Sequence, residues 1–409
     1  MMTGMKRRFA EISVWLGIFM LNCTGPVELD GPIRDRSSFS GGGSAGSGTA
    51  GDLQTMKSLY VTGVEYPPGY DWRPDLGSGA AGAKIFLMKD GVRTVEADVG
   101  YDNCISADAD MHRCIEGHLY TDFSTETETV VKCDGREIFR FFGREMIVGM
   151  LVRNDGTYTL GKPRSGSGWA FRKNGEIVLY KGAGEIVSEL HQDGGNIYFA
   201  YEDVFETSSG TTLRYYLVTN GTPQPIASTD DVTGIDDVRM SGGTLHYIAR
   251  MDKLVQSVLF SGPDGKAYPI SPGSAMRGGK LFLSESGTLF THAEILSGGR
   301  YQDAFWRGTD GPMILNYPAA AAGFCADGNN FVFSAKLSAT GLGAEIFDGQ
   351  TMHTLPSEYD LIYDSAIAAD NGRCCAAIVS RADGGPALWI NGDIRKYDFN
   401  GAFTSVSYW

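Results

Sequence analysis

The chain has 409 residues and a formal net charge of −14, and 42% of its residues are hydrophobic while 21% are charged. These values are typical of a globular protein with room for one large domain or for two or three ordinary ones. The acidic balance repels polyanions, so it argues against nucleic acid as a partner and against direct binding to acidic lipid surfaces.

The chain begins with the features of an export signal. A basic segment at Lys6–Arg8 precedes an apolar segment at 12–21, which is too short to span a bilayer but has the length of a signal core. Cys23 follows in the sequence Met-Leu-Asn-Cys, which resembles the lipobox of bacterial lipoproteins, where the cysteine is lipidated and becomes the first mature residue. Asn22 stands where that motif has Gly, Ala or Ser, and a plain secretory signal is the alternative. We expect residues 1–22 to be a lipoprotein-type signal peptide and Cys23 to carry the lipid.

Residues 23–57 offer little that a folded domain buries. This segment contains S-S-F-S-G-G-G-S-A-G-S-G-T-A-G, and Gly/Ser-rich chains of this kind are flexible tethers. About thirty-five such residues have an r.m.s. reach of about 30–35 Å. We therefore expect the segment to hold the globular part, residues 58–409, away from a membrane surface.

From residue 58 to the last residue, one pattern recurs eight times: an apolar run, then Asp-Gly or Asn-Gly, then a second run. The repeat interval averages about 43 residues. A two-residue hairpin loop needs positive φ at both central positions, which Asp or Asn tolerates at the first position and Gly at the second. Aromatic and β-branched residues on both sides favour strands, so each repeat predicts a β-hairpin. The eight glycines are Gly91, Gly135, Gly175, Gly221, Gly265, Gly311, Gly349 and Gly392.

A second series of tight turns lies between these hairpins, and each of its turns leads into an apolar strand. When the strands of one unit are labelled A to D, the second series supplies the A–B turns and the first series supplies the C–D turns. Each unit is then a four-stranded antiparallel sheet. The seven glycines of the second series are Gly117, Gly156, Gly194, Gly243, Gly287, Gly328 and Gly372.

The two series differ by one turn, and the difference predicts how the two ends of the repeat region meet. The first unit starts at residues 58–62, which have the pattern of a strand B with no strand A before it, while residues 402–409 supply a spare strand after the last unit. A closed ring accounts for both, because the C-terminal strand completes the first sheet. Closure also removes the exposed strand edges that a linear array leaves.

These repeats resemble those of β-propellers. The predicted fold is an all-β propeller over residues 58–409, closed by pairing of the C-terminal strand into the first blade. It has eight four-stranded blades, or seven if one hairpin belongs to an irregular insertion. The signatures of the WD40, sialidase and kelch families are missing from the sequence. With its amino-terminal signal, the chain resembles the propeller lipoproteins of Bacteroidota-type bacteria, which implies a place in the cell envelope at the outer membrane, periplasmic or surface-facing.

Six cysteines remain besides Cys23, an even number that permits disulfides in an exported protein. Cys104 and Cys114 are the best candidates for a pair, since a hairpin brings them opposite each other, and buried free thiols in strands are the alternative. The chain has no C-x-x-C, H-E-x-x-H or H-x-H sequence, so we expect no zinc site. We expect no cofactor, and calcium at the paired aspartates 230–231 and 236–237 is the alternative.

The A–B and C–D turns share one face of such a ring, and the B–C and D–A connections share the opposite face, which we call the long-loop face. Function on a rigid scaffold is concentrated in variable loops, so we expect a site there. The longest loop, residues 64–83, alternates aromatic residues with proline, aspartate and arginine. Aromatic rings stack on sugar rings, and carboxylates accept hydrogen bonds from sugar hydroxyls. The candidate ligand-binding residues are Tyr66, Tyr70, Asp71, Trp72, Tyr101 and Asp102.

The alternative for each of these residues is that the ring only packs a loop onto the scaffold or that the acid is only solvated. With no recognisable nucleophile or metal motif, the sequence favours a non-catalytic binding or scaffold module for a glycan or an envelope protein. A glycan-cleaving hydrolase or lyase is the second hypothesis, because carboxylates from different blades leave no linear motif. A structural envelope protein whose ring acts as a spacer is the third. We expect a monomer that touches the membrane only through its lipid.

Overall fold

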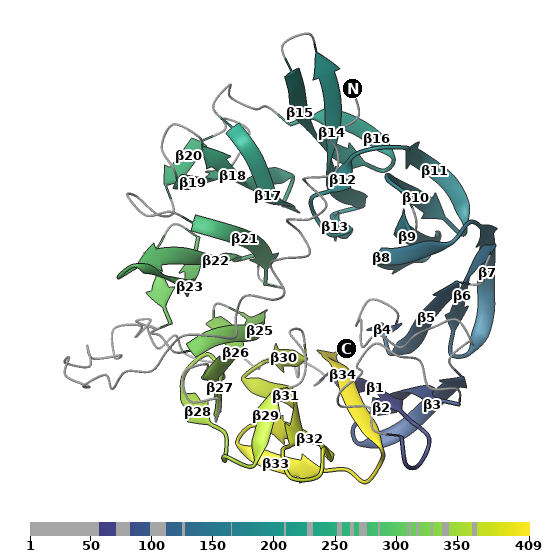
Figure 1. Cartoon of the computed structure of the whole chain (residues 1–409), viewed down its shortest axis with the longest axis vertical. Coiled ribbons are helices and arrows are strands. Elements are labelled where there is room, and N and C mark those ends of the chain that lie inside the picture. Colours follow the sequence, from purple (N-terminus) through teal and green to yellow (C-terminus); the bar gives the residue numbers. More distant parts are fainter. Residues whose placement is uncertain are drawn as a thin grey trace, which may run out of the picture. The chain divides into compact units, whose positions relative to one another are not determined.

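The described strands form eight antiparallel sheets arranged around a central opening, which confirms the predicted all-β propeller (Figure 1). Each sheet is one blade, and its strand A lies on the inside of the ring (Figure 1). The computed structural model describes residues 57–70, 82–98, 112–124, 127–164, 166–207, 210–226, 232–251, 256–261, 266–269, 276–284, 287–308, 310, 312–315, 319–328, 330–337, 343–361 and 366–409.

The first four blades follow one another along the chain, and each is given from its inner to its outer strand. Blade 1 contains β34 (Gly401–Tyr408), β1 (Leu59–Glu65), β2 (Lys84–Lys89) and β3 (Val92–Asp98). Blade 2 contains β4 (His112–Ile115), β5 (His118–Ser124), β6 (Glu128–Cys133) and β7 (Arg136–Phe142). Blade 3 contains β8 (Glu145–Arg153), β9 (Gly156–Pro163), β10 (Trp169–Lys173) and β11 (Glu176–Lys181). Blade 4 contains β12 (Glu185–Ile186), β13 (His191–Asp193), β14 (Asn196–Thr207), β15 (Gly210–Thr219) and β16 (Thr222–Pro225).

The other four blades complete the ring. Blade 5 contains β17 (Val232–Ser241), β18 (Thr244–Met251), β19 (Gln256–Ser261) and β20 (Lys266–Pro269). Blade 6 contains β21 (Met276–Leu283), β22 (Leu289–Ser297), β23 (Arg300–Arg307) and β24 (Met313–Ile314). Blade 7 contains β25 (Ala319–Asp327), β26 (Asn330–Leu337), β27 (Ala344–Phe347) and β28 (Met352–Thr354). Blade 8 contains β29 (Tyr359–Leu361), β30 (Ile367–Asp370), β31 (Arg373–Ser380), β32 (Pro386–Ile390) and β33 (Asp393–Lys396).

Blades 4 and 8 have five strands because the inner strand of each is interrupted. In blade 4, β12 and β13 both pair with β14, and in blade 8, β29 and β30 both pair with β31. The other six described sheets have the predicted four strands.

The ring closes as predicted, through the C-terminal strand. β34 pairs antiparallel with β1, so the last strand of the chain is the inner strand of blade 1 (Figure 1). The buried Thr62 hydroxyl lies 3.0 Å from that of Thr404, which adds a side-chain link within the pair. At the end of the pair, Ser58 and Trp409 exchange two backbone hydrogen bonds of 2.9 and 3.1 Å.

Five of the eight predicted C–D hairpins have positive φ at both turn residues: Asp90-Gly91, Asp134-Gly135, Asn174-Gly175, Asn220-Gly221 and Asn391-Gly392. In all five, the Asp or Asn also reaches back to strand B. Its backbone N–H donates to the carbonyl of a strand-B residue, and its side-chain oxygen accepts the N–H of that same residue, at 2.7–3.1 Å. The repeated Asp or Asn therefore has a second role besides tolerating positive φ, since it links the two hairpins of a blade.

The hairpin at Gly349 differs from the prediction. Four residues, 348–351, separate β27 from β28, and the Asp348 carboxylate accepts the backbone N–H groups of Gln350 and Thr351 at 2.8 and 2.7 Å. This aspartate shapes a wider loop than the two-residue turn expected from the Asp-Gly pair. Gly265 and Gly311 lie outside the described residues.

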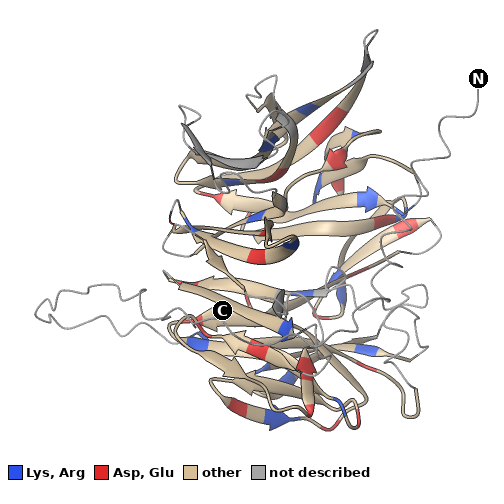
Figure 2. Cartoon of the chain, turned by 60° about the vertical axis from the view of Figure 1, so that its left-hand side comes forward, with Lys and Arg blue, Asp and Glu red and all other residues tan. Residues whose placement is uncertain are grey.

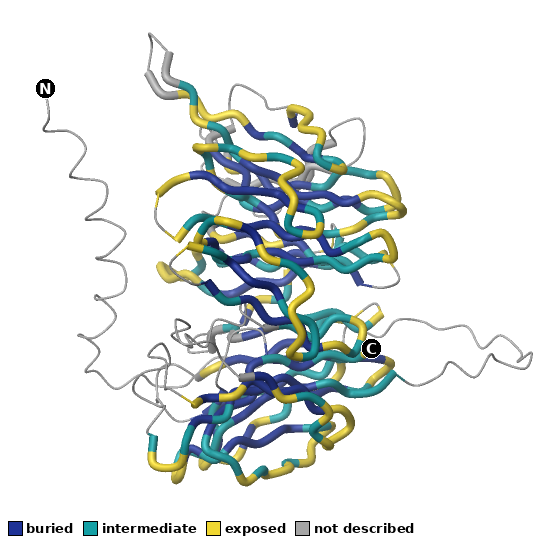
Figure 3. The backbone as a smooth tube through the Cα atoms, turned by 90° about the vertical axis from the view of Figure 1, so that its right-hand side faces the viewer, coloured by how far each residue is buried: buried dark blue, intermediate teal, exposed yellow. Residues whose placement is uncertain are grey.

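The core consists of apolar side chains packed between neighbouring blades. Trp169 and Phe171 of blade 3 contact Phe199 of blade 4, with ring centroids 5.3 and 5.2 Å apart. Buried positions follow the middle of the strands and exposed positions gather at the turns (Figure 3). Acidic and basic positions are interspersed over the strands (Figure 2).

Five cysteines, Cys114, Cys133, Cys325, Cys374 and Cys375, are free thiols in the described part of the chain, and Cys104 lies outside it. The described residues contain no helix of the length and apolarity that a membrane span requires.

Candidate functional site

Two of the predicted ligand-binding residues, Tyr66 and Tyr70, lie at the start of the longest loop and stack on each other. Their ring centroids are 5.2 Å apart with an interplanar angle of 21°. Tyr66 is 3% exposed, and burial followed by the neighbouring Tyr70 phenol raises the pKa of Tyr66 to about 12. Tyr66 therefore forms part of the core and supports Tyr70, which is partly exposed. Asp71, Trp72, Tyr101, Asp102 and Cys23 lie outside the described residues.

Asn400 fixes the start of this loop against the closing strand. Its backbone carbonyl accepts the N–H of Tyr66 at 2.7 Å. Its side-chain amide donates to the carbonyls of Pro67 and Tyr70 at 2.8 and 2.9 Å. The loop that the sequence singles out thus begins at the seam where the two ends of the ring meet.

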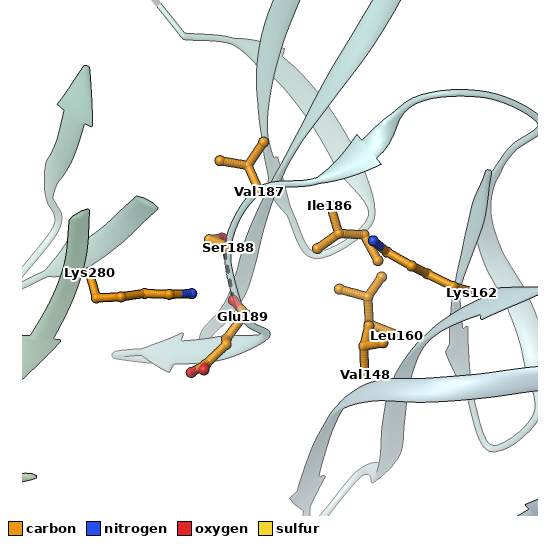
Figure 4. A pocket seen from close by; sticks show the side chains of 8 residues that line it. All are labelled: Val148, Leu160, Lys162, Ile186, Val187, Ser188, Glu189 and Lys280. Carbon is orange, nitrogen blue, oxygen red and sulfur yellow. Dashed lines mark hydrogen bonds between the residues drawn. The ribbon is translucent and has the colours of Figure 1, made fainter. Parts of the chain in front are cut away.

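A pocket of about 170 Å³ lies among the inner strands of blades 3, 4 and 6 (Figure 4). Lys280 extends toward Ser188 and Glu189, while Lys162 and apolar side chains lie on the opposite side (Figure 4). Lys162 is near the end of β9 and Ile186 is near the start of the inner strand of blade 4, where connections of the long-loop face leave the sheets. The pocket is therefore displaced toward that face. Its lining residues are Val148, Leu160, Lys162, Ile186, Val187, Ser188, Glu189 and Lys280.

The interruption between β12 and β13 places Glu189 in this pocket. The backbone N–H groups of Val187 and Ser188 both donate to the carbonyl of Ala200, at 2.9 and 3.3 Å, which makes an irregular step in the strand. The Ser188 hydroxyl accepts the N–H of Ala200 at 2.8 Å and is itself buried. The Ser188 side chain thus satisfies the buried Ala200 N–H where the regular pairing stops. The next residue, Glu189, is therefore not constrained to the path of the strand.

Cationic side chains from three other blades stabilise the negative charge of Glu189. The Arg239 guanidinium contacts its carboxylate at 2.9 Å and also donates to the Leu281 carbonyl at 3.0 Å. The surrounding protein displaces water from Glu189, and this desolvation raises its pKa. The positive charges of Arg239, Lys280 and Arg113 outweigh that effect and hold the pKa below its usual range. Lys280 is exposed and makes no hydrogen bond or ion pair within the described part of the chain. The Glu189 carboxylate and a Lys280 ammonium that has no partner among the described residues therefore share one pocket.

His191 supports the same segment in its neutral form. Its Nε2 accepts the backbone N–H of Met240 at 3.0 Å, and its Nδ1 donates to the carbonyl of Glu189 at 3.2 Å. Burial, followed by the positive charge of Arg239, lowers the pKa of His191 to about 4.

This low pKa predicts an acid-sensitive stability. Between about pH 6.5 and 4 the unfolded chain binds a proton at His191 that the folded chain does not, so the free energy of unfolding should fall as the pH drops through this window. Above about pH 6.5 this contribution is complete. Urea unfolding at several pH values should show a smaller pH dependence for His191→Gln than for the wild type, and identical pH dependences would contradict the prediction.

A second carboxylate near Arg239 belongs to the scaffold. Asp237 is 1% exposed, and its oxygens accept the N–H groups of Val238 and Leu281 at 2.8 Å each. Burial raises the pKa of Asp237, although Arg239 opposes the shift. Because its hydrogen bonds join two inner strands, Asp237 fixes β17 to β21 and does not face the pocket.

Comparison with known proteins identifies the fold only. No protein-family model and no curated protein matches the chain. Among solved structures, the dihydro-heme d1 dehydrogenase NirN in complex with DHE aligns with a TM-score of 0.52 at 12% identity, over 86% of this chain and 74% of that one. TolB from Acinetobacter baumannii aligns with a TM-score of 0.35 at 13% identity, over 85% of this chain and 82% of that one. YCF48 bound to D1 peptide aligns with a TM-score of 0.40 at 11% identity, over 70% of this chain and 95% of that one.

Proposed function

We propose that the protein is an exported, lipid-anchored β-propeller that acts as a binding or scaffold module, with a glycan or an envelope protein as its partner at the long-loop face. The observation that carries the proposal is the pocket displaced toward that face, in which Lys280 and Glu189 lie beside an apolar wall. Pockets with a few converging polar groups on an apolar surface are typical binding sites.

The chemistry of the pocket suits a hydroxyl-rich ligand. Glu189 is ionised at neutral pH and its lowered pKa extends this to more acidic conditions, so its carboxylate accepts hydrogen bonds, while Lys280 donates them. The apolar side chains of Leu160 and Ile186 provide a surface for the C–H face of a sugar ring. Tyr70 adds a partly exposed aromatic ring on the same face, at the edge of the longest loop.

The two carboxylates near Arg239 favour binding over glycan cleavage in this pocket. A glycoside hydrolase needs two carboxylates about 5–10 Å apart that both reach the substrate. Glu189 and Asp237 both lie near Arg239, but the hydrogen bonds of Asp237 to two backbone N–H groups and its 1% exposure remove it from the pocket. Glu189 alone cannot act as both acid and nucleophile.

Export and anchoring rest on the amino-terminal sequence. The basic and apolar segments before Cys23 and the Gly/Ser-rich residues after it support a lipidated, tethered envelope protein. A tether of about 30–35 Å leaves the ring free to meet a partner at a distance from the membrane.

Membrane fractionation and a glycan array test the proposal, and both use the Cys23→Ser protein. Cys23→Ser is expected to move the protein from the membrane fraction to the soluble fraction, and unchanged membrane association would refute the anchor.

On the array, the soluble Cys23→Ser protein should bind at least one glycan, and Lys280→Ala, Tyr70→Ala and Trp72→Ala in that background should each reduce the signal. Lys336→Ala removes an exposed lysine of blade 7 that does not line the pocket, so it should leave the signal unchanged. Absence of glycan binding, or binding that none of the three substitutions affects, would overturn the glycan site.

A further inference from the structure

Three side chains of different chemistry converge at the A–B and C–D turns of blade 2, on the face of the ring opposite the long-loop face. His118 is the first residue of β5, Cys133 is the last residue of β6, and Asp134 is the first residue of the turn that follows. One potential ligand atom from each of the three lies within 4.8 Å of the others, and the His118 Nδ1 is 2.7 Å from the Asp134 Oδ2. In the described part of the chain, this is the one such group of three metal-ligand side chains.

The propeller repeat itself holds these residues together. Glu116-Gly117 and Asp134-Gly135 are the A–B and C–D turns of one blade, and all four residues have positive φ. Asp134 also makes the two-way link to strand B, with its backbone N–H donating to the Leu119 carbonyl at 2.8 Å and its Oδ1 accepting the Leu119 N–H at 2.9 Å. One carboxylate oxygen is therefore used by the scaffold, and the other is directed toward His118.

Cys133 lies directly opposite Tyr120 in the pairing of β6 with β5, so its position is set by the sheet. Residues that hydrogen-bond metal ligands fix their orientation, and here the Leu119 N–H does so for the Asp134 carboxylate. Cys133 and Asp134 are partly buried, while the His118 side chain is 57% exposed, so the group is accessible from solvent.

We propose that His118, Cys133 and Asp134 bind a zinc-class divalent transition metal, with solvent at the fourth position. Imidazole nitrogen, thiolate sulfur and carboxylate oxygen are the three ligand types that Zn²⁺ takes from proteins, and three protein ligands leave one position open. The sulfur selects against Ca²⁺ and Mg²⁺, which take oxygen ligands. Binding draws the three ligand atoms onto one ion and replaces the direct contact between His118 and Asp134.

Two residues elsewhere in the chain provide matched controls. His353 lies 2.8 Å from Asp348, but no third metal-ligand side chain of the described part of the chain completes this pair to a group of three. Cys114 is another partly buried free thiol of blade 2 and is likewise outside the group. Neither control should contribute to metal binding.

The test is Zn²⁺ titration of the Cys23→Ser protein, prepared without a polyhistidine tag and stripped of metal, against a chromophoric competitor. The wild-type site should bind one equivalent, whereas Cys133→Ser and His118→Ala should each weaken binding by about tenfold or more. His353→Ala and Cys114→Ser should keep the wild-type affinity. Circular dichroism establishes that each variant is folded.

Cobalt provides a second readout that a merely structural cysteine does not give. The Co²⁺-loaded protein should show a thiolate-to-metal charge-transfer band, and Cys133→Ser should abolish it. Failure of the wild-type site to bind Zn²⁺, or binding that survives both Cys133→Ser and His118→Ala, would overturn the proposal. Because this site lies on the face that carries the A–B and C–D turns, its failure would leave the proposed binding function of the long-loop face untouched.

Discussion

Replacing Phe403 with alanine is expected to lower the free energy of unfolding by about 3–5 kcal/mol, the usual cost of deleting a buried phenylalanine ring. Phe403 lies in the closing strand β34 and is completely buried. Its ring packs edge-on against three others, those of Phe86, Tyr397 and Phe399, with centroids 5.0–6.2 Å apart. The substitution therefore opens a cavity at the seam that closes the ring.

Urea unfolding measures this effect, and Phe142→Ala is the control. Phe142 belongs to the outer strand of blade 2 and is 83% exposed, so its loss should change the free energy of unfolding by no more than about 0.5 kcal/mol. Equal effects of the two substitutions would contradict the burial of Phe403 in the closing blade.

Replacing Arg172 with methionine is expected to cost about 3–5 kcal/mol, because it leaves the charge of Glu145 buried without a partner. The guanidinium contacts both carboxylate oxygens of Glu145, at 2.6 and 3.4 Å, and lies 4.1 Å from the centre of the Phe141 ring. The two side chains are only 7% and 11% exposed. The pair joins β10 of blade 3 to the start of β8.

The double variant Arg172→Met with Glu145→Leu should recover most of the lost stability, since replacing a buried ion pair by apolar side chains is often close to neutral. Arg140→Met is the matched control, because Arg140 forms its ion pairs with Glu128 and Glu137 at the surface, where such pairs contribute about 0–1 kcal/mol. A double variant as unstable as Arg172→Met alone would show that the loss comes from packing and not from the unpaired charge.

The architecture was predictable because its information is local and repeated. A hairpin turn with positive φ at two positions restricts the sequence to Asp or Asn followed by Gly, and the chain repeats this solution. The unequal number of the two turn types was enough to predict that β34 joins β1. What the local pattern could not show is that Asn174 and its equivalents also bind strand B, since that contact joins residues fifteen or more positions apart.

The pocket was not predictable, because its residues come from three blades and carry no shared motif. Glu189 enters it only because the inner strand of blade 4 is interrupted between β12 and β13. Whether an inner strand is interrupted depends on how neighbouring blades pack, and periodicity does not report this. Tyr66 illustrates the same difficulty, since an aromatic residue in a long loop has one sequence signature whether it is exposed or, as here, 3% exposed.

The group of three metal-ligand side chains was not predictable for a different reason. Linear spacing gave no zinc motif, because His118 and the Cys133-Asp134 pair belong to different turns of blade 2 and meet only when the blade folds. The sequence instead favoured the variable loops of the long-loop face as the place for a site.

The measurement that tests the proposed function most directly is isothermal titration of a glycan identified on the array, with the Cys23→Ser protein and its Lys280→Ala and Lys336→Ala derivatives. A lost hydrogen bond to a charged group weakens binding by about tenfold or more, so Lys280→Ala should show that loss while Lys336→Ala keeps the parent affinity. Equal affinities for the parent and the Lys280→Ala protein would show that the pocket at the long-loop face is not the binding site.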